Sequence, residues 1–165
     1  MPRIRFRRRG GKRLKILLLL LSLAFAAFQY LFRTGGDQNS RDPRCGAVAA
    51  CFSGPVTRVV DGDTLDVSGE RIRLVLVDAP ERATRFGPGA TEFLRELCPL
   101  GSAALVDQDD LQQTDNYGRM LGVVWCGETR VNEAAIRAGH ARLFKRFCHQ
   151  SEFGLQLWAV ALGCQ

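Results

Sequence analysis

The feature that most constrains the fold is a series of short, β-rich apolar runs separated by glycine, proline and polar turn residues. They lie at 56–60, 64–67, 71–77, 103–107 and 120–126. In the third run, Ile72, Leu74 and Leu76 alternate with Arg73 and its polar or smaller neighbours. Successive side chains of a strand point to opposite faces. We therefore expect the three apolar residues to face a core and Arg73 to face the other side.

Three helices are predicted between and after these strands. In the first, residues 88–97, Pro88 suits the first turn, apolar residues recur at helical spacing and Pro99 ends the helix. In the second, Asn132 is the expected N-cap and Gly139 the expected end. The third is an amphipathic helix over residues 151–162. The chain is predicted to be α+β and mainly β, with a five-stranded OB-type barrel and about three helices.

Three short motifs carry acidic and basic side chains between these runs. They are Asp61-Gly62-Asp63-Thr64, the segment from Arg73 to Asp78-Ala79-Pro80-Glu81, and Asp115-Asn116-Tyr117-Gly118-Arg119. Taken singly, they are typical of a hairpin turn, a strand end before proline and a loop. Their joint occurrence, in this order between strands, favours a shared site.

The carboxylates suit a hard divalent cation. Asp63, Asp78 and Glu81 have no neighbouring Cys or His, and Ca²⁺ prefers oxygen ligands, including backbone carbonyls and water. Such an ion polarises a phosphodiester, while Glu81 can help to deprotonate an attacking water. Arg73 and Arg119 each offer a planar fork of donors that matches two phosphate oxygens. The residues thus predict metal-assisted phosphodiester cleavage.

These motifs, together with Val131-Asn132-Glu133-Ala134, resemble the staphylococcal nuclease (thermonuclease) family over about residues 55–147. The resemblance implies an OB-type barrel and a Ca²⁺-dependent nuclease that cuts DNA and RNA to leave 3′-phosphates. It also implies that Asp63, Asp78 and the Ala79 carbonyl hold the ion, with Glu81 reached through water. Arg73 and Arg119 would bind the scissile phosphate, with Glu81 as the candidate base.

The chain departs from the family's pattern at the substrate contacts. Two tyrosines that contact the nucleotide in the family's prototype correspond to Lys145 and Phe147 here, and the prototype's mobile basic loop is largely missing between Glu81 and Phe86. We expect Tyr117, Lys145 and Phe147 to contact substrate, with Phe147 or Phe144 available to stack on a base.

The positive charge lies mostly at the N-terminus. The whole chain carries +6, but residues 1–33 hold nine Lys and Arg and no acid, so residues 34–165 carry −3. Attraction to a polyanion must therefore come from local placement of basic residues and from a bound cation. For the basic residues at 142–146, a solvated surface and a substrate contact both remain open.

The N-terminal 33 residues predict export. Eight basic residues within 1–15 precede the uncharged run 16–32, which places the rest of the chain across the inner membrane of a bacterium, facing the periplasm or exterior. We expect a retained membrane anchor; a secreted form cut after Ala24-Phe25-Ala26 is the alternative. Residues 34–54 are predicted to be a linker and residues 55–165 the nuclease domain. The first strand of that domain is expected to begin at Pro55.

All six cysteines follow the hydrophobic run, and an even number suits an oxidising compartment. The absence of Cys-x-x-Cys spacing disfavours a metal site built from them. Our hypothesis for the disulfides is Cys45–Cys51, Cys98–Cys126 and Cys148–Cys164, although sequence does not choose among the pairings.

Two classes of function remain open at this stage. The first is an exported Ca²⁺-dependent nuclease acting on DNA or RNA as a monomer. The second is a membrane-tethered, non-catalytic OB-type module that binds nucleic acid or protein. A weaker third is an interaction scaffold in which Asp61 and Asp115 serve only to tie turns together. Sequence does not distinguish DNA from RNA, or endo from exo cleavage.

Overall fold

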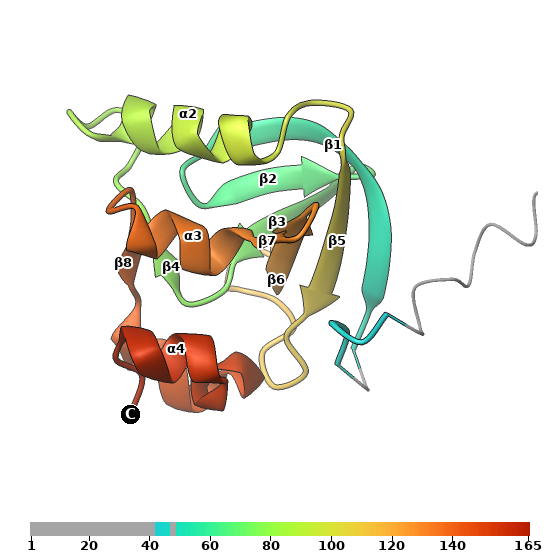
Figure 1. Ribbon diagram of the computed structural model, residues 1–165, viewed down its shortest axis with the longest axis vertical. Helices are drawn as coiled ribbons and strands as arrows, with labels where there is room; N and C mark the ends of the chain where they lie inside the picture. The colour runs from blue at the N-terminus through green and yellow to red at the C-terminus, as the bar shows by residue number, and fades with distance from the viewer. Residues whose placement is uncertain (1–41, 47–48) are drawn as a thin grey trace, which may run out of the picture. The chain divides into compact units, whose positions relative to one another are not determined.

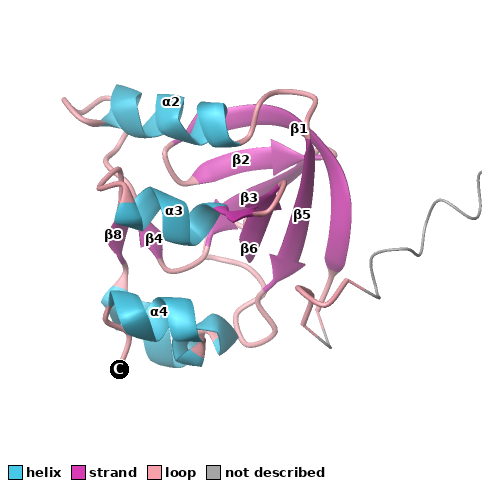
Figure 2. Ribbon diagram, viewed as in Figure 1, coloured by secondary structure: helices cyan, strands magenta, loops and turns pink. Residues whose placement is uncertain are grey.

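Five strands close on one another into a barrel in the computed structural model, which describes residues 42–46 and 49–165 (Figure 1). The strands are β1 (Cys51–Asp61), β2 (Thr64–Val67), β3 (Glu70–Leu74), β5 (Ala103–Gln108) and β6 (Met120–Cys126). Antiparallel pairs join β1 to β2, β2 to β3, β1 to β5 and β5 to β6, and a parallel pair between β3 and β6 closes the ring. The predicted five-stranded barrel is confirmed (Figure 2).

Strand β1 serves two neighbours in turn. Its first half, 51–55, pairs with β5, and its second half, from Val56 onward, pairs with β2 with irregular register. Such irregularities bend a strand and increase its twist, which lets one strand turn a barrel corner. β1 starts upstream of Pro55, inside the segment expected to be a linker.

The third apolar run is not one strand, so the prediction for 71–77 is wrong in its second half. β3 ends at Leu74, Leu76 adopts a left-handed φ of 61°, and β4 (Val77–Asp78) pairs with β8 (Arg142–Leu143) instead. Ile72 and Leu74 lie in the barrel core, but Leu76 belongs to a second apolar cluster with Phe153 and Trp158. The turn at Leu76 reverses the alternation of faces that the sequence pattern implied.

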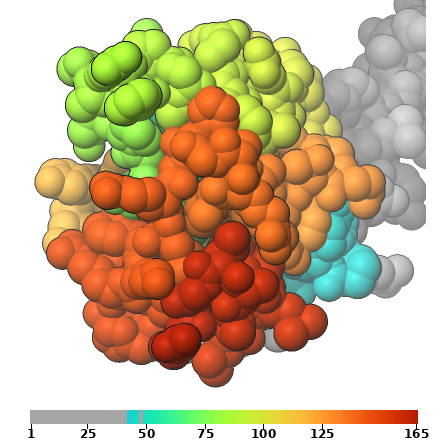
Figure 3. Space-filling model, turned by 60° about the vertical axis from the view of Figure 1, so that its left-hand side comes forward, coloured from blue at the N-terminus to red at the C-terminus, as the bar shows by residue number. Residues whose placement is uncertain are grey.

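The helices lie one above another along one side of the barrel (Figures 1 and 3). They are α2 (Gly87–Leu97), α3 (Val131–Arg137), which follows the short β7 (Thr129–Arg130), and α4 (Leu157–Leu162). The first begins and ends as Pro88 and Pro99 predict. The single helix expected over 151–162 is instead the 3₁₀ turn η3 (Glu152–Leu155) followed by α4, after a first 3₁₀ segment, η2 (Lys145–Gln150).

Asn132 does not cap α3, which corrects the second helix prediction. The N-cap is Arg130, and the Asn132 side chain is fully buried. Its amide donates to the Val75 and Gly122 carbonyls (2.9 and 3.2 Å), and its Oδ1 accepts from the Val124 amide (3.0 Å). Asn132 therefore joins α3, β6 and the segment between β3 and β4.

Three disulfides are present, Cys45–Cys51, Cys98–Cys126 and Cys148–Cys164, the same pairs that the sequence hypothesis chose. Cys98 is the C-cap of α2 and Cys126 ends β6, so this bridge ties a helix end to a strand end. Cys148 and Cys164 tie η2 to the residues just after α4.

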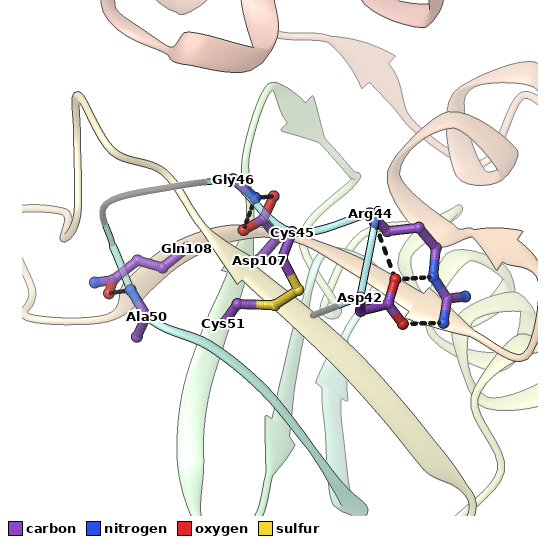
Figure 4. The surroundings of a disulfide bond; sticks show 8 residues. All are labelled: Asp42, Arg44, Cys45, Gly46, Ala50, Cys51, Asp107 and Gln108. Carbon is purple, nitrogen blue, oxygen red and sulfur yellow. Dashed lines mark hydrogen bonds and ion pairs between the residues drawn. A yellow bond between two sulfur atoms is a disulfide. The ribbon is translucent and has the colours of Figure 1, made fainter. Parts of the chain in front are cut away.

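The disulfide Cys45–Cys51 holds a short segment against four acidic residues, here called the acidic cluster: Asp107, Asp109, Asp110 and Glu152. Both carboxylate oxygens of Asp107 accept from the Gly46 amide at 2.9 Å (Figure 4). Burial raises the pKa of Asp107. Burial, and to a smaller extent repulsion from the three aspartates, raises the pKa of Glu152. Residues 42–46 are thus packed on the barrel rather than extended away from it.

Among the described residues, no helix has the length and apolar character needed to cross a bilayer. The basic run 1–15, the apolar run 16–32 and the proposed cleavage site at 24–26 all lie outside the described residues. Their export and anchoring roles stay predictions.

Candidate active site

Asp63 is the centre of the candidate site. It is the last residue of the tight connection from β1 into β2, and its side chain is almost completely buried. Its Oδ2 accepts from the Ala79 amide (2.9 Å) and forms an ion pair with Arg73 Nη1 (2.9 Å), while its Oδ1 accepts from Thr64 Oγ1 (3.1 Å). Burial raises the pKa of Asp63 to about 6, although the nearby Arg73 and the Ala79 amide lower it. The carboxylate is held in one orientation by partners from two other strands.

A glycine makes this approach possible. A Cβ on Gly62 would lie 2.8 Å from the Ala79 Cβ and 2.6 Å from the Ala90 Cβ, closer than such atoms come in proteins. Gly62 therefore lets the Asp61–Asp63 turn pack between β4 and α2. The Asp61 carboxylate shapes the same turn by accepting from the Asp63 amide (3.2 Å).

Arg73 reaches the site from β3. Its Nη1 donates to the Val77 carbonyl (2.8 Å) in addition to pairing with Asp63, and the side chain is 14% exposed. The segment that turns at Leu76 curls around this guanidinium. Arg73 is thus fixed on a rigid strand, as the sequence pattern required of a phosphate-binding residue.

Arg119 reaches the same point from the start of β6. Its Nε donates to Asp115 Oδ2 (2.6 Å), and its Nη1 lies 3.5 Å from Thr64 Oγ1. Burial works against ionisation of Asp115, but hydrogen bonds from the Arg119 amide and guanidinium and from the Tyr117 amide outweigh it, so the pKa of Asp115 is lowered. Since Thr64 is bonded to Asp63, both guanidinium groups meet at the Asp63–Thr64 pair.

The third carboxylate, Glu81, lies apart from this pair. Glu81 is exposed in the loop after β4, and within the described residues no hydrogen bond or ion pair of its carboxylate is recorded. Its backbone carbonyl accepts from Thr84 and lies only 2.1 Å from where a Cβ on Gly87 would be, so glycine is required at the start of α2. The loop is anchored, while the Glu81 side chain is free to turn.

The chemistry of these donors fits a hard cation. Asp63 and Asp78 are brought side by side, because the Asp63 carboxylate bonds the amide of the residue after Asp78, and Asp78 Oδ2 pairs with the exposed Arg142 (3.1 Å). Within residues 42–46 and 49–165, only Cys45, Cys51 and Asp107 gather as three ligand atoms, and both sulfurs belong to a disulfide. Asp63, Asp78 and Glu81 thus supply suitable oxygens at one edge of the barrel but are not drawn together around a point.

A cleft of about 190 Å³ lies beside the two arginines and is here called the first cleft. Its walls come from β3 and the turn after it, from the Asp115–Arg119 loop and from η2, and they include Arg73, Arg119, Tyr117, Phe147, Phe144 and Arg146. The Arg146 guanidinium lies over the rings of Phe144 (4.8 Å) and Phe147 (4.7 Å), and Arg119 lies over Tyr117 (5.4 Å). The cleft thus combines positive charge with aromatic faces.

Lys145 does not line the first cleft, and its contact with substrate stays a prediction. A 3₁₀ helix has three residues per turn, which places Phe144 and Phe147 on one side and Lys145 on another. The Lys145 Nζ lies 3.1 Å from where a Cβ on Gly163 would be, at the C-terminal end of α4. A cation is favourable at that position because helix carbonyls converge there.

Sequence reasoning missed two contributors to the site. Asn132 holds the segment between Arg73 and Asp78, and nothing in its local pattern distinguishes that role from helix capping. Arg146 was counted only as one member of a basic run, although its spacing between Phe144 and Phe147 is a signal that it stacks on both rings.

Comparison with known proteins agrees with the geometry. A sequence model described as "Staphylococcal nuclease homologue" matches residues 71–157. A thermonuclease of Staphylococcus intermedius is 31% identical over 137 residues, covering 77% of each chain. Protein ParB of Escherichia coli is 45% identical over 105 residues, covering 56% of this chain and 57% of ParB.

An uncharacterized endonuclease of Escherichia coli O157:H7 is 37% identical over 105 residues, which cover 61% of this chain and 66% of that protein. The match therefore spans less than two thirds of the length of these Escherichia coli relatives. With the barrel, the paired arginines and the family match in agreement, the chain belongs to the family of staphylococcal nuclease homologues.

Proposed function

We propose that this protein is a Ca²⁺-dependent nuclease that hydrolyses phosphodiester bonds of DNA, RNA or both and leaves 3′-phosphate products. One observation carries the proposal: guanidinium groups from β3 and β6 meet at the Asp63–Thr64 pair beside a cleft with aromatic walls. Relatives named thermonuclease and endonuclease support it.

Each residue has a separate task in this proposal. Arg73 and Arg119 bind the non-bridging oxygens of the scissile phosphate, where negative charge increases in the transition state. Glu81, exposed and without a recorded partner, accepts a proton from the attacking water. Tyr117 and Phe147 offer faces on which a base stacks.

Asp63, Asp78, the Ala79 carbonyl and Glu81 would hold the ion, as all-oxygen donors suited to Ca²⁺. When bound, a divalent ion supplies charge stabilisation and orientation at a phosphodiester. The ion pairs that Asp63 and Asp78 make with Arg73 and Arg142 orient these two carboxylates.

The test is digestion of plasmid DNA and of RNA by the full-length protein, with Ca²⁺ and with a chelator. Cleavage should depend on Ca²⁺, and product ends should carry a 3′-phosphate. Arg119→Lys should lower kcat about 100-fold or more, because a point charge does not replace a bidentate fork. Arg71→Lys is the matched control, since Arg71 also pairs with an aspartate, Asp66, but outside the site.

Full activity in chelator would contradict the Ca²⁺ requirement. Binding of nucleic acid without cleavage under any divalent ion would instead favour the non-catalytic OB-type module. Glu81→Gln separates these functions further, because it should abolish turnover while leaving binding intact.

We also propose that the protein is exported and remains anchored in the bacterial inner membrane. The support is the basic and apolar character of residues 1–33 and the three disulfides, which persist in oxidising compartments. Cell fractionation with N-terminal sequencing tests this, and a soluble mature protein beginning near Ala27 would replace the anchor with a cleaved signal. The monomeric state stays a prediction.

A further inference from the structure

A second cleft, of about 650 Å³, opens beside Asp78. Its walls are the loop after β4, the start of α2 and the segment leading into β8: Asp78, Pro80, Arg85, Phe86, Gly89, Gly139, His140, Ala141 and Arg142. None of these residues lines the first cleft.

The two clefts are joined by the β4–β8 pair. Val77 lines the first cleft and the next residue, Asp78, lines the second. On the facing strand, Arg142 lines the second cleft, and Phe144, just after that strand, lines the first. Adjacent residues of a strand are about 3.3 Å apart. The two clefts therefore come within one residue of each other at Val77 and Asp78, and Asp78 is a proposed ligand of the ion that acts on the scissile phosphate.

The second cleft repeats the chemistry of the first. The Phe86 ring is 68% exposed, and the Arg85 guanidinium lies 5.5 Å from its centre. The first cleft has the same pairing of arginine with aromatic ring at Arg119 and Tyr117. Rings of this kind accept any base by stacking, and the arginines meet the phosphates between bases.

Charge complementarity identifies the occupant. Residues 34–165 carry a net charge of −3, yet each cleft has one arginine that forms no ion pair within the described residues, Arg85 in the second cleft and Arg146 in the first. Concentrating cations in two adjoining clefts of an acidic domain favours a polyanion that runs through both.

Resting on the proposed nuclease function, we infer that the second cleft binds the nucleotide on the far side of the scissile phosphate. The substrate is then a single-stranded stretch of nucleic acid held on both sides of the bond that breaks, with one base against Tyr117 or Phe147 and another against Phe86. Binding on both sides favours cleavage within a chain over hydrolysis of mononucleotide esters.

Two variants of the full-length protein test the second cleft. Phe86→Ala removes the exposed ring. Gly89→Leu fills the cleft from α2, at a position where an added Cβ meets no atom within 4 Å and which therefore tolerates a side chain. The matched controls are Leu155→Ala, an apolar residue 86% exposed, and Arg58→Ala, an exposed arginine, neither of which lines a cleft.

The measurements are kcat/KM for a single-stranded pentathymidylate with Ca²⁺, and the inhibition constant of thymidine 5′-monophosphate, which has one base. Loss of one stacked base should lower kcat/KM for the pentanucleotide about 5- to 100-fold in both variants. The inhibition constant of thymidine 5′-monophosphate should stay within about twofold of wild type, because this ligand occupies the first cleft alone.

If wild type cleaves the pentanucleotide and both variants match it, the second cleft does not bind substrate and the inference fails alone. The same result is expected if the cleft serves a protein partner or a second copy of the chain. Parallel loss of pentanucleotide cleavage and mononucleotide inhibition would also overturn it, because the effect would then lie in the first cleft. No cleavage by wild type would overturn the nuclease function and this inference together.

Discussion

Replacing Asn132 separates a buried structural bridge from a helix cap. The structure predicts that Asn132→Ala leaves two buried groups, the Val124 amide and the Val75 carbonyl, without the partner that Asn132 supplies. The third group, the Gly122 carbonyl, still accepts from the Val75 amide at 3.0 Å. Each buried group left unpaired costs about 1–3 kcal/mol, so the free energy of unfolding should fall by about 2–6 kcal/mol.

Loss of a cap costs typically about 1 kcal/mol, whereas a domain of this size has about 5–15 kcal/mol in total. The melting temperature of the Ala variant should therefore fall by about 10 °C or more. Asn132→Asp sharpens the distinction, because Asp is as good an N-cap as Asn. In the buried site it lacks the amide donors and places a negative charge beside two carbonyl oxygens, so it too should be strongly destabilising.

Thermal and urea unfolding of full-length variants measure this, with Asn116→Ala as the exposed asparagine control. Activity should fall with stability, since Asn132 holds the segment that joins Arg73 to Asp78. A melting temperature of Asn132→Asp equal to that of wild type would refute the reasoning and restore the capping role.

Other measurements address the acidic cluster, the central disulfide and the candidate cation site. Because the pKa of Glu152 is raised, its contribution to stability is present below its unfolded pKa and is lost as pH rises through the folded pKa. Glu152→Gln keeps the Oε1 acceptor and should melt higher than wild type at pH 7.5 but not at pH 4; a lower melting temperature at pH 7.5 would be inconsistent with repulsion in the cluster. Replacing Cys98 and Cys126 by Ala removes a disulfide between residues 28 apart in sequence and should lower the free energy of unfolding, measured in urea, by about 3–4 kcal/mol. A decrease under 1 kcal/mol would show that this disulfide constrains the unfolded chain little. Arg142→Ala removes a cation 3.1 Å from Asp78; calorimetry should show Ca²⁺ binding up to about fivefold tighter, as expected for an exposed pair, and weaker binding would exclude competition at Asp78.

Local patterns were sufficient where neighbouring residues decide the structure. Four of the five predicted strand positions, the extent of α2 between Pro88 and Pro99 and the turn formed by Asp61 and Gly62 depend on alternation, proline geometry and short-range hydrogen bonds. These are properties of a few consecutive residues, and the structure has them.

Long-range contacts decided the places where local patterns failed. Residues 71–77 alternate as one strand would, but the pairing of β4 with β8 and the turn at Leu76 break it. Asn132 precedes a helix as a cap would, but β6 and the Val75 segment surround it.

The sequence by itself determined the chemistry of this protein: which oxygens suit a cation, which guanidinium groups suit a phosphate, and that a β-barrel displays them. Tertiary structure alone decided how these groups meet. Asp63 and Asp78 are adjacent only because Gly62 has no side chain, and Val77 and Asp78 line two different clefts because β4 pairs with a strand more than sixty residues away. Residue type sets what a side chain can do, but distance between side chains is set by packing of segments that are remote in the chain.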